Sequence, residues 1–587
     1  MDMLKIWRSS KSRFGKFTVN PVPEGEETWN VNKVYTDAEL AKIADSGFNA
    51  VWIHGLLHSI VKTDDFPELG EYAAEHQQRL NELTERAAKY GIKVFIYMQP
   101  PRALLTTHPI FKNHPEIAGQ IESLQGCEGD MVNVQALCTS HESVKKYLKN
   151  AAAKLAEKVP DLGGIIMITA SEYPAHCWSR RGRMMDANGH YQINPIACPR
   201  CKDRKPGEVV NEVIQLMRDG IRSVNQDWKI IAWNWSWAMY EDAPCENIIR
   251  NLPSDVILMA DFERGGKRTI LGKERIMDEY SLGYAGPSKQ FRDSSEIARL
   301  YNRQMMAKLQ IGTTHELATV PNLPIIGNIY RKAVNVRKMG LAGFMGTWNF
   351  GNMITANTAA LNHFLEENIS DDQALELRKF AEKYFPGCHA GNIAEAWDKF
   401  AEAMDFYPFS IPYLYVGPTN YACILPMEPA PLTGKSSGRS WLMDERGDDI
   451  SNAIAGYTID EIIEGFNCLT KIWGTGVELL AEGLANVPSA HAEEELDNAR
   501  VCYHLFKSTE NFCKIFKIRS NWKAEKLPEY HAIAEAELKN LRLLLPLIEK
   551  DSRFGFHIEA FGYQFDAEQI KRKIETIEAQ LLTAKGK

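Results

Sequence analysis

The sequence lacks any long apolar run. No stretch approaches the roughly 18 consecutive apolar residues of a transmembrane helix. The first residues, Met1 to Arg8, lack the apolar core of about 7–15 residues that a secretory signal peptide contains. We therefore expect no membrane partner. As given, the sequence predicts a cytoplasmic protein, although a leader could have been removed.

An excess of basic charge is also missing. Lys and Arg total 68 against 76 Asp and Glu, and the formal net charge is -8. No Lys/Arg-rich run provides the basic patch of a nucleic-acid-binding protein, so we expect no nucleic-acid partner. No His-x-His motif follows the first predicted strand, which disfavours a metal-dependent hydrolase. With 587 residues and 44% hydrophobic content, the chain has enough apolar material for about two or three globular domains.

Cysteine is sparse, with 11 residues scattered along the chain, which favours reduced thiols over a disulfide framework. One cluster differs from this pattern. Cys198 and Cys201 form a C-x-x-C pair, and His176 and Cys177 lie upstream. Cys177, Cys198 and Cys201 could bind a structural zinc ion together with His176 or Cys127, although unligated thiols would give the same pattern. We expect no cofactor to be required for catalysis.

Short apolar runs alternate with helix-like stretches in the first part of the chain. Glycine often precedes the run, as at Gly47, Gly91 and Gly340, and this is the helix-to-strand joint of parallel α/β folds. The runs that we interpret as strands cover residues 4–9, 48–54, 92–98, 164–171, 229–235, 255–261, 309–315 and 341–348. Helices are predicted between them, as at 142–159, 206–224 and 294–309, and 131–137 could be a ninth strand. This alternation predicts a (β/α)8 TIM-type barrel over residues 1–365.

After about residue 365 the strand pattern gives way to long helical patterns. They cover residues 371–384, 393–404, 458–485, 490–516, 529–549 and 567–582, which predicts an α-helical domain over 366–587. An aromatic and proline-rich stretch, 406–432, interrupts them. It is too apolar for a free linker, so we expect it to lie against the barrel or against a second subunit of a homodimer. Its tyrosines, which would line a pocket or simply pack between domains, are Tyr407, Tyr413, Tyr415 and Tyr421.

The ends of the predicted strands carry residue types that are typical of sugar-binding sites. Aromatic faces stack on a pyranose, while Asn, Asp, Arg and His satisfy its hydroxyl groups. The predicted substrate-binding residues are Arg8, His54, Trp233, Asp261, His315, Trp348 and Asn349. Trp233, Trp235 and Trp237 share one face while strand geometry lasts, so this run could instead be core packing.

Two glutamates at strand ends suggest glycosidic bond cleavage. Glu172 directly follows a buried apolar run, and Glu316 follows the predicted seventh strand, so the two would face each other across the barrel mouth. Glycoside hydrolysis usually uses one carboxyl group as acid and a second as nucleophile or base. We therefore interpret Glu172 as the acid and Glu316 as the nucleophile. Alternatively, each is a salt-bridged structural residue at a strand end.

The approach to Glu172 also resembles a known family. The segment from Thr139-Ser140-His141-Glu142 to Val159-Pro160-Asp161, followed by Gly164 to Glu172, is similar to the run before the catalytic acid of family 20 β-hexosaminidases. His54, the segment Gly91-Ile92-Lys93-Val94 and Arg8 resemble the same family's barrel order. The resemblance covers about the first 240 residues, and it implies that Glu172 is the acid and Arg8 a sugar ligand.

One departure from the family bears on the mechanism. The family places Asp directly before the acid, where it orients the substrate acetamide that acts as nucleophile, whereas this chain has Ser171. Either another residue such as Asp261 takes that role, or Glu316 is an enzyme nucleophile. We therefore expect an exo-acting glycoside hydrolase, β-selective and retaining, that removes a terminal N-acetylhexosamine or hexose. The alternative is a non-catalytic carbohydrate-binding protein on a degenerate barrel.

Overall fold

The structure is a computed structural model and describes residues 3–13, 23–125, 131–181, 183–185, 191–193, 195–366, 368–436, 445–560 and 562–585. The chain forms two compact units. The first, here called the barrel unit, comprises Met1–Phe262, Lys289–Leu309 and Gly340–Gly346. The second, the helical unit, comprises Glu263–Ser288, Gln310–Met339 and Thr347–Lys587. The units alternate along the chain, whereas the sequence suggested two consecutive domains, and the boundary at 365 remains a prediction.

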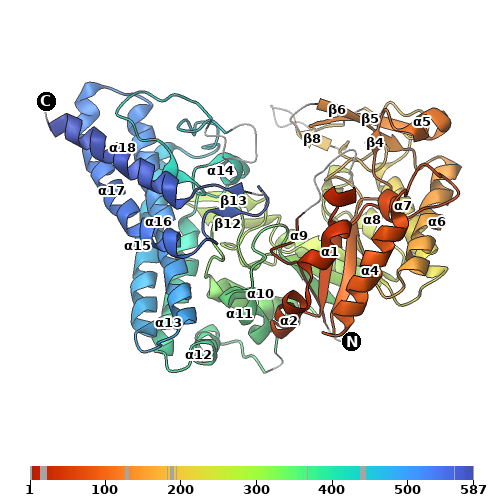
Figure 1. Cartoon of the computed structure of the whole chain (residues 1–587), viewed down its shortest axis with the longest axis horizontal. Coiled ribbons are helices and arrows are strands. Elements are labelled where there is room, and N and C mark those ends of the chain that lie inside the picture. Colours follow the sequence, from red (N-terminus) through yellow and green to blue (C-terminus); the bar gives the residue numbers. More distant parts are fainter. Residues whose placement is uncertain are drawn as a thin grey trace. The chain divides into compact units, whose positions relative to one another are not determined.

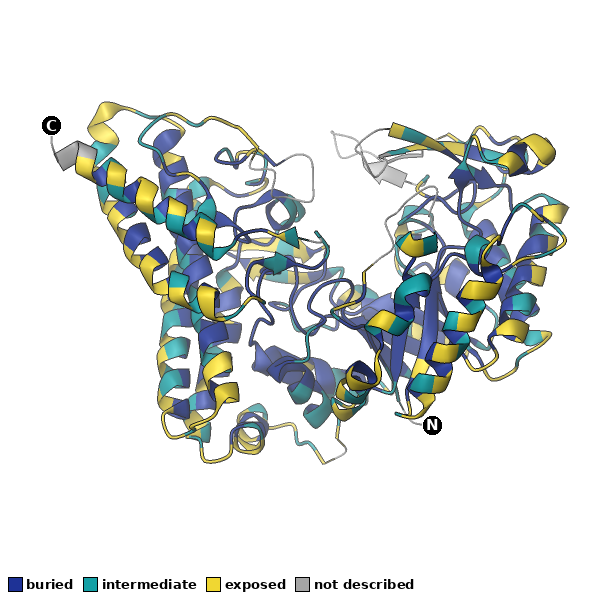
Figure 2. Cartoon of the chain, viewed as in Figure 1, coloured by how far each residue is buried: buried dark blue, intermediate teal, exposed yellow. Residues whose placement is uncertain are grey.

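A closed barrel of eight parallel strands forms the centre of the barrel unit, as predicted (Figure 1). Around the barrel the strands follow the order β1-β15-β14-β11-β10-β7-β3-β2. Their bounds are Leu4–Trp7 for β1, Ala50–His54 for β2, Lys93–Met98 for β3, Gly164–Ile168 for β7, Lys229–Trp233 for β10, Val256–Asp261 for β11, Met305–Leu309 for β14 and Gly343–Gly346 for β15. These strands are buried along most of their length (Figure 2), as expected for a parallel sheet covered on both faces.

Strand β7 shows why these runs become strands. Its sequence, Gly-Ile-Ile-Met-Ile, is buried throughout and pairs with β10 over its full length. At its start, Gly164 has a φ of +145°, and a Cβ there would lie 1.8 Å from the carbonyl oxygen of Lys229. Only glycine fits this close approach of two backbones. The strand therefore begins where the sequence predicted, but it ends at Ile168, before Glu172.

Helices connect the strands in chain order. Those between β1 and β15 are α1 (Glu27–Val34), α2 (Asp37–Asp45), α3 (Leu57–Ile60), α4 (Ala73–Ala88), α5 (Pro109–Asn113), α6 (Glu142–Lys158), α7 (Pro206–Arg222), α8 (Glu246–Arg250), α9 (Lys289–Leu300) and α10 (Ile326–Lys338). Helix α7 is typical: Val209, Val213 and Met217 repeat at the spacing of one helix face, and all three are buried. The predicted helices 142–159 and 206–224 are confirmed to within two residues at their ends.

The predicted seventh strand was placed too late in the chain. Residues 294–309 were expected to be helical, but α9 ends at Leu300 and β14 occupies Met305–Leu309. The sequence of β14, Met-Met-Ala-Lys-Leu, is rich in good helix formers, and its Lys308 is fully buried. A buried lysine breaks the apolar pattern by which a barrel strand is recognised. As a result, Glu316 lies well beyond the end of the seventh strand and not at it.

Short antiparallel sheets lie outside the barrel strands. Residues Met131–Leu137 do form a strand, β6, but it pairs with β4 (Leu104–Leu105) and β5 (Ala118–Gln125) and is not part of the barrel. The remaining small sheets are two-stranded: β8 (Arg183–Met185) with β9 (Tyr191–Ile193), β12 (Gly266–Ile270) with β13 (Lys273–Met277), and β16 (Phe556–His557) with β17 (Gly562–Tyr563). Cys138 directly follows β6 of the β4–β6–β5 sheet.

Long helices dominate the C-terminal part of the helical unit, as predicted. They are α11 (Ala356–Phe364), α12 (Gln373–Tyr384), α13 (Ala390–Ala403), α14 (Ile411–Val416), α15 (Ile459–Leu484), α16 (Ala490–Arg519), α17 (Leu527–Lys550) and α18 (Ala567–Lys585). Helix α15 begins with a capping box, in which Thr458 and Glu461 bond reciprocally to each other's backbone N–H. The helix starts that the sequence suggested near Thr458 and at Ala490 are confirmed.

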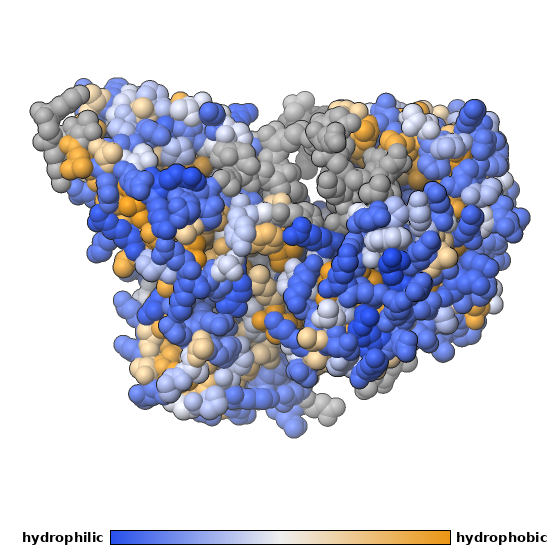
Figure 3. All heavy atoms as spheres, in the orientation of Figure 1, coloured by the Kyte–Doolittle hydropathy of each residue, from blue (hydrophilic) through white to orange (hydrophobic). Residues whose placement is uncertain are grey.

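The aromatic and proline-rich stretch packs inside its own unit. Tyr407 and Tyr413 are buried, and their rings lie 5.8 and 6.1 Å from the ring of Phe466 on α15. These tyrosines are core residues of the helical unit. Hydrophilic residues cover most of the face of the molecule seen in Figure 3. Across the described residues, none of the helices has the length and apolar content that a bilayer crossing needs.

Candidate active site

Glu172 lies in the loop after β7, at the carboxyl end of the fourth barrel strand in chain order. This is the end of a (β/α)8 barrel at which catalytic residues are found. The residue is half-buried, whereas the strand before it is fully buried. Its charge affects Tyr97 on the neighbouring strand β3: burial and then the negative charge of Glu172 raise the pKa of Tyr97 well above its usual value. Tyr97 therefore keeps its proton at neutral pH.

Strained backbone marks the loops after three neighbouring strands. Arg102 after β3, Glu172 after β7 and Ser236 after β10 have φ angles of 71°, 66° and 64°. Residues other than glycine rarely adopt this left-handed conformation, which costs about 1–3 kcal/mol unless the surroundings enforce it. Such residues cluster at functional sites, because the strain is retained only where a particular side-chain position is needed.

Contacts from the β3 loop hold the loop that carries Glu172. The guanidinium carbon of Arg102 lies 3.6 Å from the centre of the Tyr173 ring, next in sequence to Glu172. One residue further along each loop, the Ala103 backbone N–H donates to the Pro174 carbonyl oxygen at 2.8 Å. Arg102 is buried. A cation stacked on an aromatic ring away from water is worth about 2 kcal/mol, so the two loops support each other.

Gln99 joins the polar side chains at the ends of β2 and β3. Its Oε1 accepts from Arg102 at 2.8 Å and lies 3.4 Å from His54 Nε2, and its Nε2 donates to the Tyr97 hydroxyl at 2.6 Å. All four side chains are buried. Burial, together with the charge of Arg102, lowers the pKa of His54 well below its usual value, so this imidazole is neutral. His54 therefore lies beside Gln99 and Tyr97, and of this group Tyr97 is the residue whose pKa the Glu172 charge affects.

The β10 side of the loop is held by hydroxyl and indole groups. Ser171 donates to Ser236 between side-chain oxygens 2.7 Å apart, and Trp237 Nε1 donates to Thr169 at 3.1 Å. Tyr240 donates from its hydroxyl to the Ala170 carbonyl oxygen at 3.1 Å. Each residue from Thr169 to Ser171 thus has a partner on the segment after β10. Glu172 is positioned from both neighbouring strands.

Asp261, at the end of β11, accepts a hydrogen bond from Trp233 Nε1 at 3.1 Å. Trp233 is fully buried, so its ring belongs to the interior of the barrel unit. Trp235 is only half-buried, and its ring lies 5.9 Å from that of Trp233. The strand ends at Trp233, so the predicted shared face of Trp233, Trp235 and Trp237 does not extend through the run. Of these three residues, only Trp235 is partly exposed.

Arg8 is placed differently from what its position at the end of β1 suggested. Its guanidinium group is fully buried, bonds to both oxygens of the Glu27 carboxylate at 2.9 Å and lies 4.1 Å from the centre of the Trp52 ring. A bidentate pair of this kind compensates both buried charges. Arg8 therefore fixes helix α1 to the barrel wall in this structure, and its role as a sugar ligand remains a prediction.

Glu316 belongs to the helical unit, and its carboxylate is enclosed there. It is 2% exposed. Within that unit it accepts from the Ser281 hydroxyl at 2.8 Å, the Leu282 N–H at 2.7 Å, the Thr314 hydroxyl at 2.7 Å and, more weakly, the Gly283 N–H at 3.3 Å. A carboxylate with this many donors is held in place. These bonds fix the turn at 281–283.

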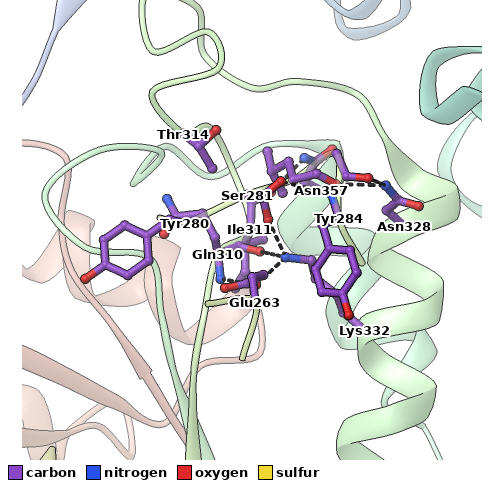
Figure 4. A network of polar contacts seen from close by, with 12 residues as sticks. Glu263, Tyr280, Ser281, Tyr284, Gln310, Ile311, Thr314, Asn328, Lys332 and Asn357 are labelled. Atoms are coloured by element: carbon purple, nitrogen blue, oxygen red, sulfur yellow. Dashed lines mark hydrogen bonds and ion pairs between the residues drawn. The ribbon is translucent and has the colours of Figure 1, made fainter. Parts of the chain in front are cut away.

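Figure 4 shows the polar network next to this turn, which is also within the helical unit. Lys332 forms an ion pair with Glu263, both fully buried, and donates to the carbonyl oxygens of Ser281 and Gln310 at 3.0 Å. Asn328 donates to the Leu282 carbonyl oxygen at 2.8 Å. Buried ion pairs are tolerated when further hydrogen bonds compensate them, as here. The surroundings of Glu316 thus form a dense internal network of hydrogen bonds.

The other predicted residues of the last two strands also lie in the helical unit. His315 is 4% exposed, its Nε2 is 3.4 Å from a Glu559 carboxylate oxygen, and its ring lies 4.6 Å from Phe350 and 5.0 Å from Tyr415. Trp348 and Asn349 are 6% and 8% exposed. The structure thus groups Glu172, His54, Trp233 and Asp261 in one unit and Glu316, His315, Trp348 and Asn349 in the other.

Sequence reasoning missed Tyr97 and Tyr173 as members of the site, and it named Trp235 only as part of the tryptophan run. Tyr97 is the second-last residue of β3, and Tyr173 directly follows the proposed acid. Aromatic residues beside strand ends were a usable signal. Only the structure shows that burial and the charge of Glu172 raise the pKa of Tyr97 and that Tyr173 stacks on Arg102.

The predicted cysteine cluster is present, with a different fourth member. Cys138, Cys177, Cys198 and Cys201 are all buried, and their sulfur atoms lie within 4.8 Å of one another. His176 is turned away from this group: its Nε2 lies 2.5 Å from the Thr169 carbonyl oxygen, and burial lowers its pKa to about 4. Cys127 lies outside the described residues. The fourth thiol comes from the end of β6, far upstream of the C-x-x-C pair, so sequence spacing did not indicate it.

Comparison with solved structures identifies barrels of the same type. A family 138 glycoside hydrolase that targets the pectin rhamnogalacturonan II matches with a TM-score of 0.56 and 12% identity, over 100% of this chain and 68% of that enzyme. The family 89 glycoside hydrolase from Clostridium perfringens in complex with PUGNAc matches with a TM-score of 0.54 and 11% identity, over 99% of this chain and 64% of that enzyme. This chain thus spans about two thirds of the length of each enzyme.

At these identities the likeness shows the fold alone. A family 20 chitobiase from Flavobacterium johnsoniae is also among the matches, at 12% identity and a TM-score of 0.34, which is too low to support an argument. The similarity to family 20 therefore remains a prediction. No protein-family model and no curated protein sequence matches the chain.

Proposed function

We propose that this protein is a glycoside hydrolase in which Glu172 is the general acid. The observation that carries the proposal is the position of Glu172: half-buried, in a left-handed backbone conformation, after the fourth strand of a closed parallel barrel. An acid that protonates a leaving oxygen must be held still and must reach its substrate, and this position meets both needs. The glycoside hydrolases among the structural matches support the same chemistry.

Within this proposal, the substrate's own acetamide is the nucleophile. Its carbonyl oxygen would attack the anomeric carbon of a terminal β-N-acetylhexosaminide while Glu172 transfers its proton to the departing glycosidic oxygen. Glu172 would then accept a proton from the water that opens the cyclic intermediate, so the configuration is retained. Asp261 is the candidate for orienting the acetamide N–H. It is a carboxylate of the same unit, held by Trp233, whereas Glu316 is enclosed by donors of the helical unit.

The half-buried ring of Trp235 would stack on the apolar face of the terminal sugar. Exo action on a single non-reducing sugar is part of the same proposal. The alternative to the acetamide mechanism is an enzyme nucleophile, Glu316, which would allow plain hexosides such as β-galactosides to react.

The test is hydrolysis of paired aryl glycosides, each N-acetylhexosaminide against the matching hexoside in both anomeric forms. We expect turnover of the β-N-acetylhexosaminides, inhibition by an oxazoline-like analogue, and release of the β-anomer as the first product seen by NMR. Glu172→Gln should lose activity, while Glu296→Gln, at an exposed position on α9, should not. Equal turnover of plain hexosides would reject acetamide participation. Binding of a glycan without turnover of any substrate would favour the non-catalytic alternative.

A further inference from the structure

Four buried cysteines from three separate segments converge in the barrel unit. Cys138 directly follows β6, Cys177 lies in the loop that carries Glu172, and Cys198 and Cys201 precede α7. The Cys138 sulfur is 3.6 Å from those of both Cys198 and Cys201. A tetrahedral ion with metal–sulfur bonds of about 2.3 Å separates its ligands by roughly 3.8 Å. The observed spacing is that of a closed tetrahedral site.

The surroundings of the four sulfur atoms suit thiolates bound to a cation. Arg200 Nε donates to the Cys138 sulfur at 3.2 Å, and the Ser140 hydroxyl lies 3.2 Å from the Cys201 sulfur. Arg204 donates to the Ser140 hydroxyl at 2.6 Å. A tetrathiolate zinc site carries two net negative charges, and such polar neighbours compensate them and orient the ligands.

The backbone around the C-x-x-C pair has the form of a metal-binding turn. The N–H groups of Cys201 and Lys202 both donate to the Cys198 carbonyl oxygen, at 3.1 and 3.0 Å, so both sulfur atoms project from one tight turn. Gly119 packs closely against the cluster, because a Cβ at this position would lie 2.6 Å from the Cys177 sulfur. The cluster is therefore a compact cage made by four thiols.

We propose that Cys138, Cys177, Cys198 and Cys201 bind one structural zinc ion, which anchors the loop carrying Glu172. Four thiolates leave no open position for a substrate or water, so this ion has no direct part in bond cleavage. It would tie the loop after β7 to the β4–β6–β5 sheet and to the start of α7. The metal assignment is independent of the proposed glycosidase activity, whereas the importance of the anchored loop rests on it.

Metal content of the purified full-length protein tests the assignment directly. We expect about one zinc per chain, released when an organomercurial titrates the thiols, and a cobalt-substituted protein with the absorption of tetrahedral tetrathiolate cobalt. Cys138→Ser and Cys198→Ser should each lose the metal, whereas Cys245→Ser, at another buried cysteine of the same unit, should retain it. If the variants do not fold, the metal content of the wild-type protein still decides whether the site binds zinc.

Several results would overturn the proposal. They are purified protein without metal, four freely titrating thiols, a mass deficit that shows two disulfides, or iron in place of zinc. The anchoring role has its own readout, because removal of the metal should raise amide hydrogen exchange of residues 170–181 roughly tenfold. Zinc present with unchanged exchange in this segment would reject the anchoring role. None of these measurements depends on finding a substrate.

Discussion

The loops that carry Glu172 and Glu316 place their carboxylates in opposite environments. Glu172 is half-buried and lies on strained backbone, in a loop held by contacts within the barrel unit. Glu316 is enclosed, and its oxygens accept from the Ser281, Leu282 and Thr314 donors of the helical unit. One loop holds its carboxylate where a ligand can reach it, and the other uses its carboxylate to hold a turn.

This difference teaches that position in the chain is a weak guide to the role of an acidic residue. Both glutamates were predicted to be at strand ends. Burial separates them, because Glu316 is 2% exposed and accepts from several buried donors, whereas Glu172 is half-buried. The backbone conformation points the same way, since Glu172 has a φ of 66° and such residues cluster at functional sites.

The largest expected effect comes from Glu172→Gln. General acid catalysis contributes about 10²- to 10⁴-fold, so kcat should fall by about that factor for substrates whose leaving group needs protonation. The loss should shrink as the leaving phenol becomes more acidic, because such a group departs without a proton. The measurement is kcat across a series of aryl glycosides. A loss that does not vary with the leaving group would remove Glu172 from the acid role.

The second effect is on stability, and it tests the opposite side of the comparison. In Glu316→Gln an amide group would face some of the donors that the carboxylate now accepts from, which should cost about 2–4 kcal/mol of unfolding free energy. Calorimetry should show a lower Tm, with activity retained below the transition. Glu478→Gln, at an exposed position on α15, is the matched control. Full loss of activity at an unchanged Tm would favour Glu316 as the nucleophile. The proposed difference in role between Glu172 and Glu316 would then be wrong.

Glu26 is a third carboxylate, and it sharpens the comparison because it is buried but accepts few hydrogen bonds. Glu26 is 5% exposed, and its Oε2 has no hydrogen-bond partner among the described residues. Burial raises its pKa to about 7, although Ser59 and Arg102 oppose the shift. A raised pKa means that the folded state binds more protons than the unfolded state. The stability contribution is complete below about pH 4.5 and is lost as the pH rises through about 7.

Replacing this carboxylate with a neutral amide should remove that pH dependence. We expect Glu26→Gln to be close to the wild type in stability at pH 4.5 and more stable by about 1–3 kcal/mol at pH 8. The measurement is the denaturation midpoint of both proteins across this range. Parallel pH curves for the two proteins would show that Glu26 is ionised in the folded state throughout.

The sequence was a good guide to the fold. Apolar runs and glycine joints identified the barrel, and long amphipathic patterns identified the C-terminal helices. The main error was β14, because the burial of Lys308 is a tertiary effect that no local pattern contains. For the site, Glu172 and the C-x-x-C pair were visible locally. The Gln99 contacts, the stacking of Arg102 on Tyr173 and the inclusion of Cys138 depend on chain segments that meet only in the folded protein.

The alternation of the two units along the chain has a consequence for how the molecule can be divided. The barrel closes only when Gly343–Gly346 has been synthesised, and two segments of the helical unit, Glu263–Ser288 and Gln310–Met339, precede this strand in the chain. Neither unit is a continuous stretch of polypeptide, so a truncation at residue 365 would separate those early segments from the helices with which they form one unit. Expression of either part alone should therefore yield an incomplete unit, and a cut at any single position between residues 263 and 346 would divide at least one of the two units.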